Sequence, residues 1–280
     1  MTPAPSGFVT RFAPSPSGLL HRGHAYSALI AHDAAKEAGG GFLLRIEDID
    51  TARCRPEFAD AIFDDLAWLG LAWETPVVFQ SRRAKAYAGA LRSLRERNLL
   101  YRCFRTRAEV LDEIARAPHG PQAPFLGAPL DPEEEARRLA EGAPFAWRLS
   151  VDAAEAALGG FGGLTFVDQA LGEMVADPHR AGDVVLARKE VGVSYHLAVT
   201  VDDADAGVTC VIRGEDLIEA CHVQRLLQAL LGLPTPLYRH HPLILRPDGK
   251  RLAKRDSTET LRSLRAAGMT PQRLRAELGA

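Results

Sequence analysis

The sequence predicts an α/β fold in which a parallel sheet is built in two halves, with an α+β subdomain inserted between them. Two observations support this prediction. An apolar run, an alanine-rich helical pattern and a second apolar run follow one another between residues 8 and 46. Short apolar runs separated by glycines occupy residues 144–190, and strand and helix patterns alternate again from Ser194. Strand–helix–strand units build parallel sheets, whereas closely spaced short runs indicate a small β-containing insertion.

The first half of the sheet is expected to begin the chain. In order, we expect a strand at 8–12, a helix at 24–38, a strand at 42–46, and helices at 56–69 and 81–97. Gly39 ends the first helix, and Pro56 and Gly70 bracket the second, since proline favours the first turn and glycine the position after the last. Ser81 is expected to cap the third helix.

The middle and the end of the chain are expected to be less regular. A short helix begins at Thr106, where Glu109 completes a capping box, and four prolines make residues 117–131 irregular. A charged helix follows and ends at Gly142. After the insertion we expect a strand at 207–213, a helix at 219–231, an apolar run at 242–245 and two short closing helices.

Composition excludes several classes of protein. The chain has 280 residues, 46% of them hydrophobic and 25% charged, with a net charge of -2, which is typical of a globular protein. No apolar run approaches the roughly 20 residues that span a bilayer, and residues 1–7 do not resemble a signal peptide. The 4 cysteines are scattered, so we expect reduced thiols and no disulfide framework. We therefore expect a cytoplasmic protein without membrane contact.

Two histidines form the first candidate motif. His21 and His24, with Gly23 between them, lie where a proline- and glycine-rich loop enters a helix. Free backbone N–H groups and the helix dipole favour phosphate at such a position, and imidazoles there can stabilise charge during nucleotidyl transfer. Considered alone, the pair is equally well explained as surface or helix-capping histidines.

A basic run far downstream forms the second candidate motif. Residues 250–255 contain four cations within six positions, including Arg251 and Lys254, directly after a turn. A basic loop of this kind can close over a triphosphate and neutralise the departing pyrophosphate. A single charge run is more often a solvated surface, so the argument depends on its pairing with the histidines.

Together the two motifs resemble the early and late signatures of class I aminoacyl-tRNA synthetases. Five further blocks narrow the resemblance to the glutamyl-tRNA synthetase family: RFAPSPSG at 11–18, RIED at 45–48, YHLAV at 195–199, VDD at 201–203 and VIRGEDL at 211–217. The resemblance implies a Rossmann-like class I synthetase catalytic domain. It places the first half at 1–100, the inserted α+β subdomain at 101–190, the second half with the late basic loop at 191–256, and a short helical C-terminal segment at 257–280.

The resemblance also implies which residues bind the substrates. The glutamate residues are Arg11, Ala13, Ser15, Glu47, Tyr195 and Arg213, and the catalytic and ATP residues are His21, Gly23, His24, Arg251 and Lys254. The chemistry of the side chains agrees, because a dicarboxylic amino acid needs cations for its carboxylates and an acidic group for its ammonium. ATP is the co-substrate, and we expect Mg²⁺ on its phosphates.

The chain departs from the family pattern in three places. Zinc in the insertion usually needs a Cys-x-Cys pair, but here Arg105 follows Cys103 and Phe104, so we expect no zinc or other metal, with His119 as a weak objection. The late signature has Ala253 where the family usually has serine. Only 25 residues follow Arg255, so we expect no anticodon-binding domain.

The short form resembles the branch of the family that attaches glutamate to queuosine in the anticodon loop of tRNA(Asp). We therefore expect L-glutamate, ATP and queuosine-containing tRNA(Asp) as substrates, activation of glutamate without tRNA, and a monomeric protein. Three alternatives stay open: an enzyme that charges the 3′ end of tRNA(Glu), a catalytically inactive paralogue that binds RNA, and a nucleotidylyltransferase, which shares the histidine motif but lacks the arginine blocks.

Overall fold

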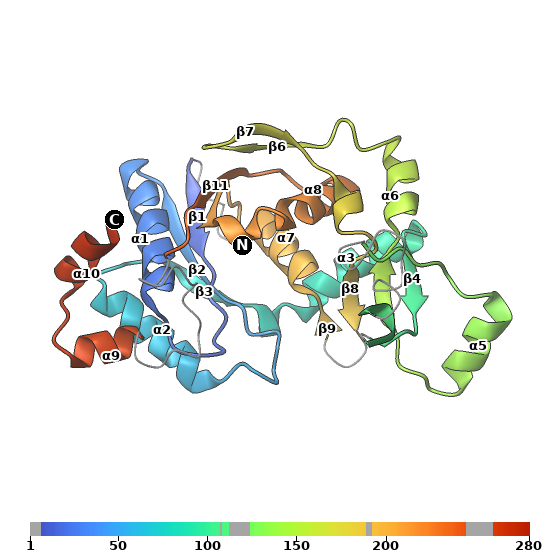
Figure 1. Cartoon of the computed structure of the whole chain (residues 1–280), viewed down its shortest axis with the longest axis horizontal. Helices are drawn as coiled ribbons and strands as arrows, with labels where there is room; N and C mark the ends of the chain where they lie inside the picture. The colour runs from blue at the N-terminus through green and yellow to red at the C-terminus, as the bar shows by residue number, and fades with distance from the viewer. Residues whose placement is uncertain (1–6, 107, 112–123, 189–191, 245–259) are drawn as a thin grey trace.

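The first sheet is parallel and carries the predicted strand–helix–strand unit. The computed structural model describes residues 7–106, 108–111, 124–188, 192–244 and 260–280. The sheet has the order β1-β2-β3, formed by β1 (Val9–Phe12), β2 (Gly41–Ile46) and β3 (Glu74–Phe79), with both pairings parallel. The connecting helices are α1 (Arg22–Glu37) and α2 (Pro56–Trp68), as Figure 1 shows. The predicted unit at 8–46 is confirmed.

The second sheet combines the end of the chain with a hairpin from its middle. Its order is β10-β11-β6-β7, formed by β10 (Cys210–Gly214), β11 (Leu237–His241), β6 (Thr165–Asp168) and β7 (Gly172–Val175). β10 and β11 are parallel, as are β11 and β6, while β6 and β7 form an antiparallel hairpin. Thr209 N donates to Val9 O at 2.9 Å, so β10 lies beside β1 and the two parallel sheets adjoin. The helices α7 (Tyr195–Asp205) and α8 (Ala220–Leu231) belong to this half.

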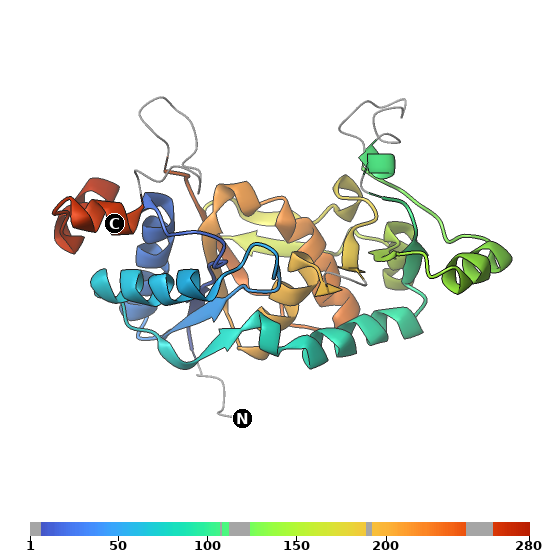
Figure 2. The ribbon, with the colours of Figure 1, turned by 90° about the horizontal axis from the view of Figure 1, so that it is seen from below.

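A third, antiparallel sheet lies to one side of the molecule. Its order is β4-β5-β8-β9, formed by β4 (Leu100–Cys103), β5 (Ala146–Leu149), β8 (Val185–Arg188) and β9 (Gly192–Val193). The helices α5 (Pro132–Ala140) and α6 (Val151–Leu158) accompany it in Figure 1. The helix α3 (Ala84–Glu96) runs from β3 toward this sheet along the lower edge of Figure 2.

The two closing helices pack against the first sheet's helices. They are α9 (Leu261–Ala266) and α10 (Pro271–Leu278), and their prediction is confirmed. Leu261 and Leu274 are fully buried in the core that α1 and α2 share with β1 and β2. A second core is built around α7 and α8 and extends to β5 and β6. Three short 3₁₀ turns, η1 (Gln80–Arg82), η2 (Pro178–Arg180) and η3 (Glu215–Leu217), connect these elements.

Several predicted element ends differ from the structure. Ser81 does not cap α3, because its hydroxyl donates to Asp48 at 2.6 Å and α3 begins three residues later, at Ala84. The strand predicted at 207–213 begins only at Cys210, since Gly207 has a φ of 66° in the turn after α7. The capping box of Thr106 and Glu109 is confirmed by reciprocal hydrogen bonds of 2.6 and 3.2 Å.

None of the helices in the described ranges is long and apolar enough to cross a membrane. The four cysteines are free thiols, and only Cys54 is partly exposed.

Candidate active site

The carboxyl ends of β1, β2 and β10 enclose a pocket of about 380 Å³. Side chains of parallel strands converge at this edge of a sheet, which is where α/β proteins bind their ligands. The pocket is lined by every described residue that the sequence singled out for glutamate or ATP: Arg11, Ala13, Ser15, His21, Gly23, His24, Glu47, Tyr195 and Arg213. The structure therefore brings residues from positions 11 to 213 into one cavity.

The late basic motif, which includes Arg251 and Lys254, lies outside the described residues, and so does His119. The described residues on either side of the motif lie at the pocket. Leu243 and Ile244 line the pocket before the motif, and Thr260 forms a β-bridge with His21 after it. The described residues on both sides of 245–259 thus lie in the wall of this cavity or pair with a residue of that wall.

The two histidines cap α1 and also face the pocket. His21 is the N-cap residue: its Nδ1 accepts from Gly23 N at 3.1 Å, and His24 Nδ1 accepts from His21 N at 3.1 Å. The rings lie with centroids 3.8 Å apart. Because both Nδ1 atoms accept hydrogen bonds, each neutral ring carries its hydrogen on Nε2. The two histidines therefore cap the helix and also line the pocket, and the hydrogen of each neutral ring is on Nε2.

Arg213 is a buried cation held by neutral partners. Its Nε donates to His240 Nε2 at 3.1 Å and its Nη2 to Leu217 O at 3.1 Å. His240 in turn bonds through Nδ1 to Asp168 Oδ2 at 2.7 Å, which fixes the ring tautomer and its orientation. Within the described ranges, Arg213 has no carboxylate partner in an ion pair and its Nη1 makes no hydrogen bond. Its charge is therefore available to an anion in the pocket.

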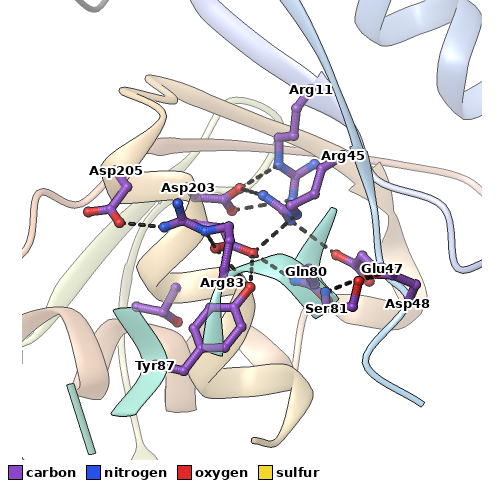
Figure 3. Close-up of polar contacts among 12 residues, drawn as sticks. Arg11, Arg45, Glu47, Asp48, Gln80, Ser81, Arg83, Tyr87, Asp203 and Asp205 are labelled. Atoms are coloured by element: carbon purple, nitrogen blue, oxygen red, sulfur yellow. Dashed lines mark hydrogen bonds and ion pairs between the residues drawn. The ribbon is translucent and has the colours of Figure 1, made fainter. Parts of the chain in front are cut away.

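Arg11 and Glu47, which line the pocket, belong to a buried ionic cluster, whose contacts Figure 3 shows. Arg11 donates to Asp203 through Nε at 3.1 Å and Nη2 at 3.5 Å, and Arg45 donates to the same carboxylate at 2.5 Å. Arg45 also bonds Glu47 at 3.1 Å. Asp202 beside them accepts from other side chains, among them Gln80 at 2.8 Å, Tyr87 at 2.9 Å and Arg83 at 2.5 Å.

The cluster shifts the pKa values of two of its carboxylates in opposite directions. Burial alone would raise the pKa of Asp203, but Arg11 and Arg45 outweigh it and lower that pKa to about 2. Burial raises the pKa of Glu47 above its ordinary value, and Arg45 reverses only part of this effect. Asp203 is thus a fixed anion, whereas Glu47 is a buried carboxylate that would gain from a second cation.

A larger pocket of about 650 Å³ adjoins the first. The two share Ser15, Glu47 and Tyr195, so a group in one cavity can reach a group in the other. His196 lines the larger pocket, where burial and the charge of Arg213 lower its pKa to about 4. Its ring is therefore neutral near pH 7.

The residues at the expected zinc position do not form a metal site. Cys103 is buried in a small apolar cluster with Tyr101, Val110 and Phe125. Across the described ranges, which leave out His119, no group of three or more histidine, cysteine or acidic residues could hold a metal ion. The donors present in these ranges do not fit zinc, and the predicted absence of zinc from the whole chain stays a prediction.

Sequence reasoning missed the supporting residues. The quoted blocks include Arg45, Asp202 and Asp203, but no local pattern assigns a role to them or to His240. The available signal was burial: two adjacent acids lie within a helix whose other residues are mostly apolar, and buried acids need cationic partners. His241, which follows His240 on β11, lines the first pocket. Its Nδ1 donates to Pro242 O, so its Nε2 accepts a hydrogen bond from Ser27 Oγ at 2.8 Å.

Comparison with known proteins agrees with this geometry. Residues 8–279 match the family model described as tRNA synthetases class I (E and Q), catalytic domain. A glutamyl-Q tRNA(Asp) synthetase of Rhodobacter capsulatus is 46% identical over 97% of this chain and 99% of its own length. A protein of the same name from Symbiobacterium thermophilum is 44% identical over 94% of this chain and 82% of its own length.

Solved structures show the same relationship. The crystal structure of a glutamate-tRNA synthetase from Elizabethkingia anophelis superposes with a TM-score of 0.74 at 30% identity and covers 89% of this chain. The match includes 53% of that structure, so this chain spans about half the length of the solved synthetase.

Proposed function

The chain belongs to the class I tRNA synthetase family for glutamate and glutamine, within its catalytic domain, and from this premise we propose that it activates glutamate with ATP and transfers it to queuosine of tRNA(Asp). It is a ligase-type enzyme of aminoacyl transfer. The observation that carries the proposal is the pocket that joins Arg213, which has no carboxylate partner among the described residues, a buried carboxylate and two histidines at a helix N-terminus.

Glutamate binding is assigned to the walls of this pocket. Arg213 Nη1 offers a charge-assisted hydrogen bond to a substrate carboxylate, and Glu47 offers its buried charge to the ammonium group. The bidentate edge of Arg11 is already used by Asp203, so Arg11 acts on the second carboxylate through its remaining N–H groups and its charge. Ser15 and Tyr195 supply hydroxyls, and Ala13 leaves room beside them.

ATP binding is assigned to the N-terminal end of α1 and to the late basic motif. His21 and His24 donate from Nε2 to phosphate oxygens, and Gly23 lets the backbone approach closely. Arg251 and Lys254 lie in the chain between Ile244, which lines the pocket, and Thr260, which forms a β-bridge with His21. Mg²⁺ would be held mainly by the phosphates themselves, where it offsets their charge.

The reaction needs no protein nucleophile. A carboxylate oxygen of glutamate attacks the α-phosphorus of ATP, the bond to the β-phosphate oxygen breaks, and pyrophosphate leaves. A hydroxyl of the acceptor then attacks the carbonyl carbon of the mixed anhydride, loses its proton, and displaces AMP. Catalysis is therefore positioning and charge stabilisation by the residues of the pocket.

The acceptor assignment follows the relatives. Five similar proteins, between 38% and 46% identical, bear the name glutamyl-Q tRNA(Asp) synthetase, and the first matches this chain over 99% of its own length. We further propose that residues 101–190 contact the RNA, that 1–100 and 191–256 form the catalytic halves, and that the enzyme acts as a cytoplasmic monomer.

Exchange of labelled pyrophosphate into ATP tests the activation step. We expect exchange that depends on glutamate among the amino acids and needs no RNA. Lys254→Ala should lower the exchange rate through kcat, because its charge is needed as pyrophosphate departs. Arg239→Ala on β11, which lies outside both pockets, is the control and should leave exchange intact.

Mapping of the attached glutamate tests the acceptor. After transfer to queuosine-containing tRNA(Asp), nuclease digestion should place the label in the anticodon loop. Label at the 3′ end of tRNA(Glu), or exchange that appears only with tRNA(Glu), would replace the proposal with ordinary charging. Absence of exchange under every condition would favour an inactive RNA-binding paralogue.

The pKa of Glu47 predicts a pH dependence of glutamate binding. Burial raises this pKa, so in the free enzyme Glu47 takes up a proton at a higher pH than an exposed glutamate does. Only the ionised carboxylate pairs with the ammonium group, so the KM for glutamate should rise as the pH falls through the raised pKa. Glu47→Gln should have a high KM that no longer changes over that range. An identical pH profile for both proteins would remove Glu47 from the ammonium site.

A further inference from the structure

A third pocket continues from the larger one toward the antiparallel sheet, and its inference rests on the proposed function. It has a volume of about 490 Å³ and shares the wall residues Ile49, Gln80, Ala187, Arg188, Gly192 and Val193 with the 650 Å³ pocket. The cavities therefore form one path: substrate pocket, larger pocket, third pocket. An RNA loop that places one nucleotide at the glutamate end can place its neighbour in the third pocket.

The third pocket presents aromatic and apolar surfaces. Phe145 and Trp147 on β5 line it from one side, with ring centroids 5.5 Å apart, and α3 lines it from the other. Arg95 and Arg102 each lie with their guanidinium carbon 4.6 Å from the Trp147 ring centre, which holds the indole in place. The two ring planes are perpendicular, at 88°, so a nucleobase here can lie against the face of one ring and meet the other ring at its edge.

The α3 side of the pocket is small and flat. Ala84, Ala88 and Leu91 follow at helical spacing and line the cavity, and both alanines are exposed. Tyr87 of the same helix also lines the cavity but is buried, so the two alanines form the solvent-facing part of this wall. In the same helix Ser93 is exposed and lies half a turn away from this face, outside the cavity.

The helix beside this pocket is strongly basic although the whole chain carries a net charge of -2. Residues 81–97 contain 6 cations and 1 anion. Lys85 and Arg92 are seven residues apart, hence on the same flank of α3, next to the row of alanines. In the described part of the chain, Lys85, Arg92 and the exposed Arg188 make no ion pairs with acidic side chains. Unpaired cations beside an aromatic slot are the pattern of single-stranded nucleic-acid binding.

We propose that the third pocket binds the unpaired nucleobase next to the one that accepts glutamate. The base packs among Phe145, Trp147 and the alanines of α3, while Lys85, Arg92 and Arg188 contact the phosphates around it. Stacking fixes the strand's position, and so brings the acceptor hydroxyl to the glutamate end of the path. The site is sequence-tolerant, because stacking depends on a ring face and not on a hydrogen-bond pattern.

The test fills the pocket without removing any contact. Ala88→Trp places an indole in the slot, and Ser93→Trp places the same side chain on the opposite face of α3 as the matched control. The probe is a queuosine-containing anticodon stem-loop RNA, with its Kd measured by fluorescence anisotropy, alongside glutamate-dependent pyrophosphate exchange. We expect Ala88→Trp to raise Kd about tenfold or more and Ser93→Trp to leave it unchanged, with exchange equal in all three proteins.

An RNA that lacks the neighbouring base provides a second test of the pocket. If the neighbouring base occupies the slot, its removal should weaken binding to the natural chain, and Ala88→Trp should then cause little further loss, because both changes remove one contact. Lys85→Glu with Arg92→Glu should also raise Kd and reduce the salt dependence of binding.

Two outcomes separate this inference from the proposed function. Equal Kd values for the natural chain and Ala88→Trp, with exchange present, would overturn the base pocket and leave glutamate activation standing. Loss of affinity in Ala88→Trp without exchange in any protein would support the base pocket and overturn the enzymatic proposal. Additive losses from the abasic RNA and Ala88→Trp would place the base elsewhere.

Discussion

Arg213→Ala is expected to lower kcat/KM for glutamate in pyrophosphate exchange by about 100-fold or more. Arg213 is buried, its hydrogen bonds go to a histidine, a backbone carbonyl and a thiol, and its Nη1 makes none within the part of the chain that the structure describes. Removal of one member of a desolvated charge pair costs roughly 3–5 kcal/mol, because the other charge is left without its partner. In the variant, that other charge is the carboxylate of the bound glutamate.

The control for this prediction is a second partly buried arginine on the next helix. Arg225 donates from Nε to Thr165 O at 2.8 Å and lies outside the pockets, so Arg225→Ala should cost stability without changing the KM for glutamate. Arg213→Lys should recover only part of the loss, since an ammonium cannot reproduce the fork of a guanidinium. Unchanged exchange in Arg213→Ala would show that this arginine does not bind the substrate.

The candidate active site shows which of its features can be predicted from the sequence. The strand–helix–strand unit followed from its apolar runs and glycines, and a parallel sheet brings strand ends together wherever they lie in the chain. Arg11, Glu47 and Arg213 were expected at such ends, and the structure places all three in one cavity. The local sequence pattern and the topology of parallel sheets are therefore sufficient to predict that these three side chains meet.

The partners of these residues could not be predicted in the same way. The sequence assigns Arg11 to glutamate binding, but the Nε and Nη2 edge of its guanidinium is occupied by Asp203, 192 residues away. Likewise, Arg213 is oriented by His240 and then Asp168, a contact made because β6 joins β11 in the second sheet. Such pairings depend on strand order, and periodicity within a segment does not determine which distant strands become neighbours.

Asp203→Asn is expected to destabilise the fold by roughly 3–5 kcal/mol, the usual cost of removing one partner from a buried ion pair. Asp203 accepts from Arg11 and Arg45, and all three side chains are almost completely buried. The asparagine side chain has the same shape as aspartate but carries no charge. The two guanidiniums therefore lose the carboxylate that offsets their mutual repulsion. For a chain of this size the melting temperature should fall by roughly 10 °C, as calorimetry or circular dichroism would measure.

Asp205→Asn is the matched control, because Asp205 lies in the same helix and also pairs with an arginine, but its side chain is 51% exposed. Exposed ion pairs contribute little, so its melting temperature should change by no more than about 2 °C. Equal shifts for the two variants would mean that burial does not determine the strength of the Asp203 interaction.

The pH dependence of the unfolding free energy provides a second test of the Asp203 interaction. The pKa of Asp203 is lowered to about 2 in the folded protein, below the ordinary value of about 3.9 for the unfolded chain. A lowered pKa contributes stability that is complete above the unfolded value and is lost as the pH falls through the folded one. The difference in unfolding free energy between the natural chain and Asp203→Asn should therefore be constant above about pH 5 and shrink between about pH 4 and pH 2. A difference that stays constant down to pH 2 would show that Asp203 is not held ionised by its two arginines.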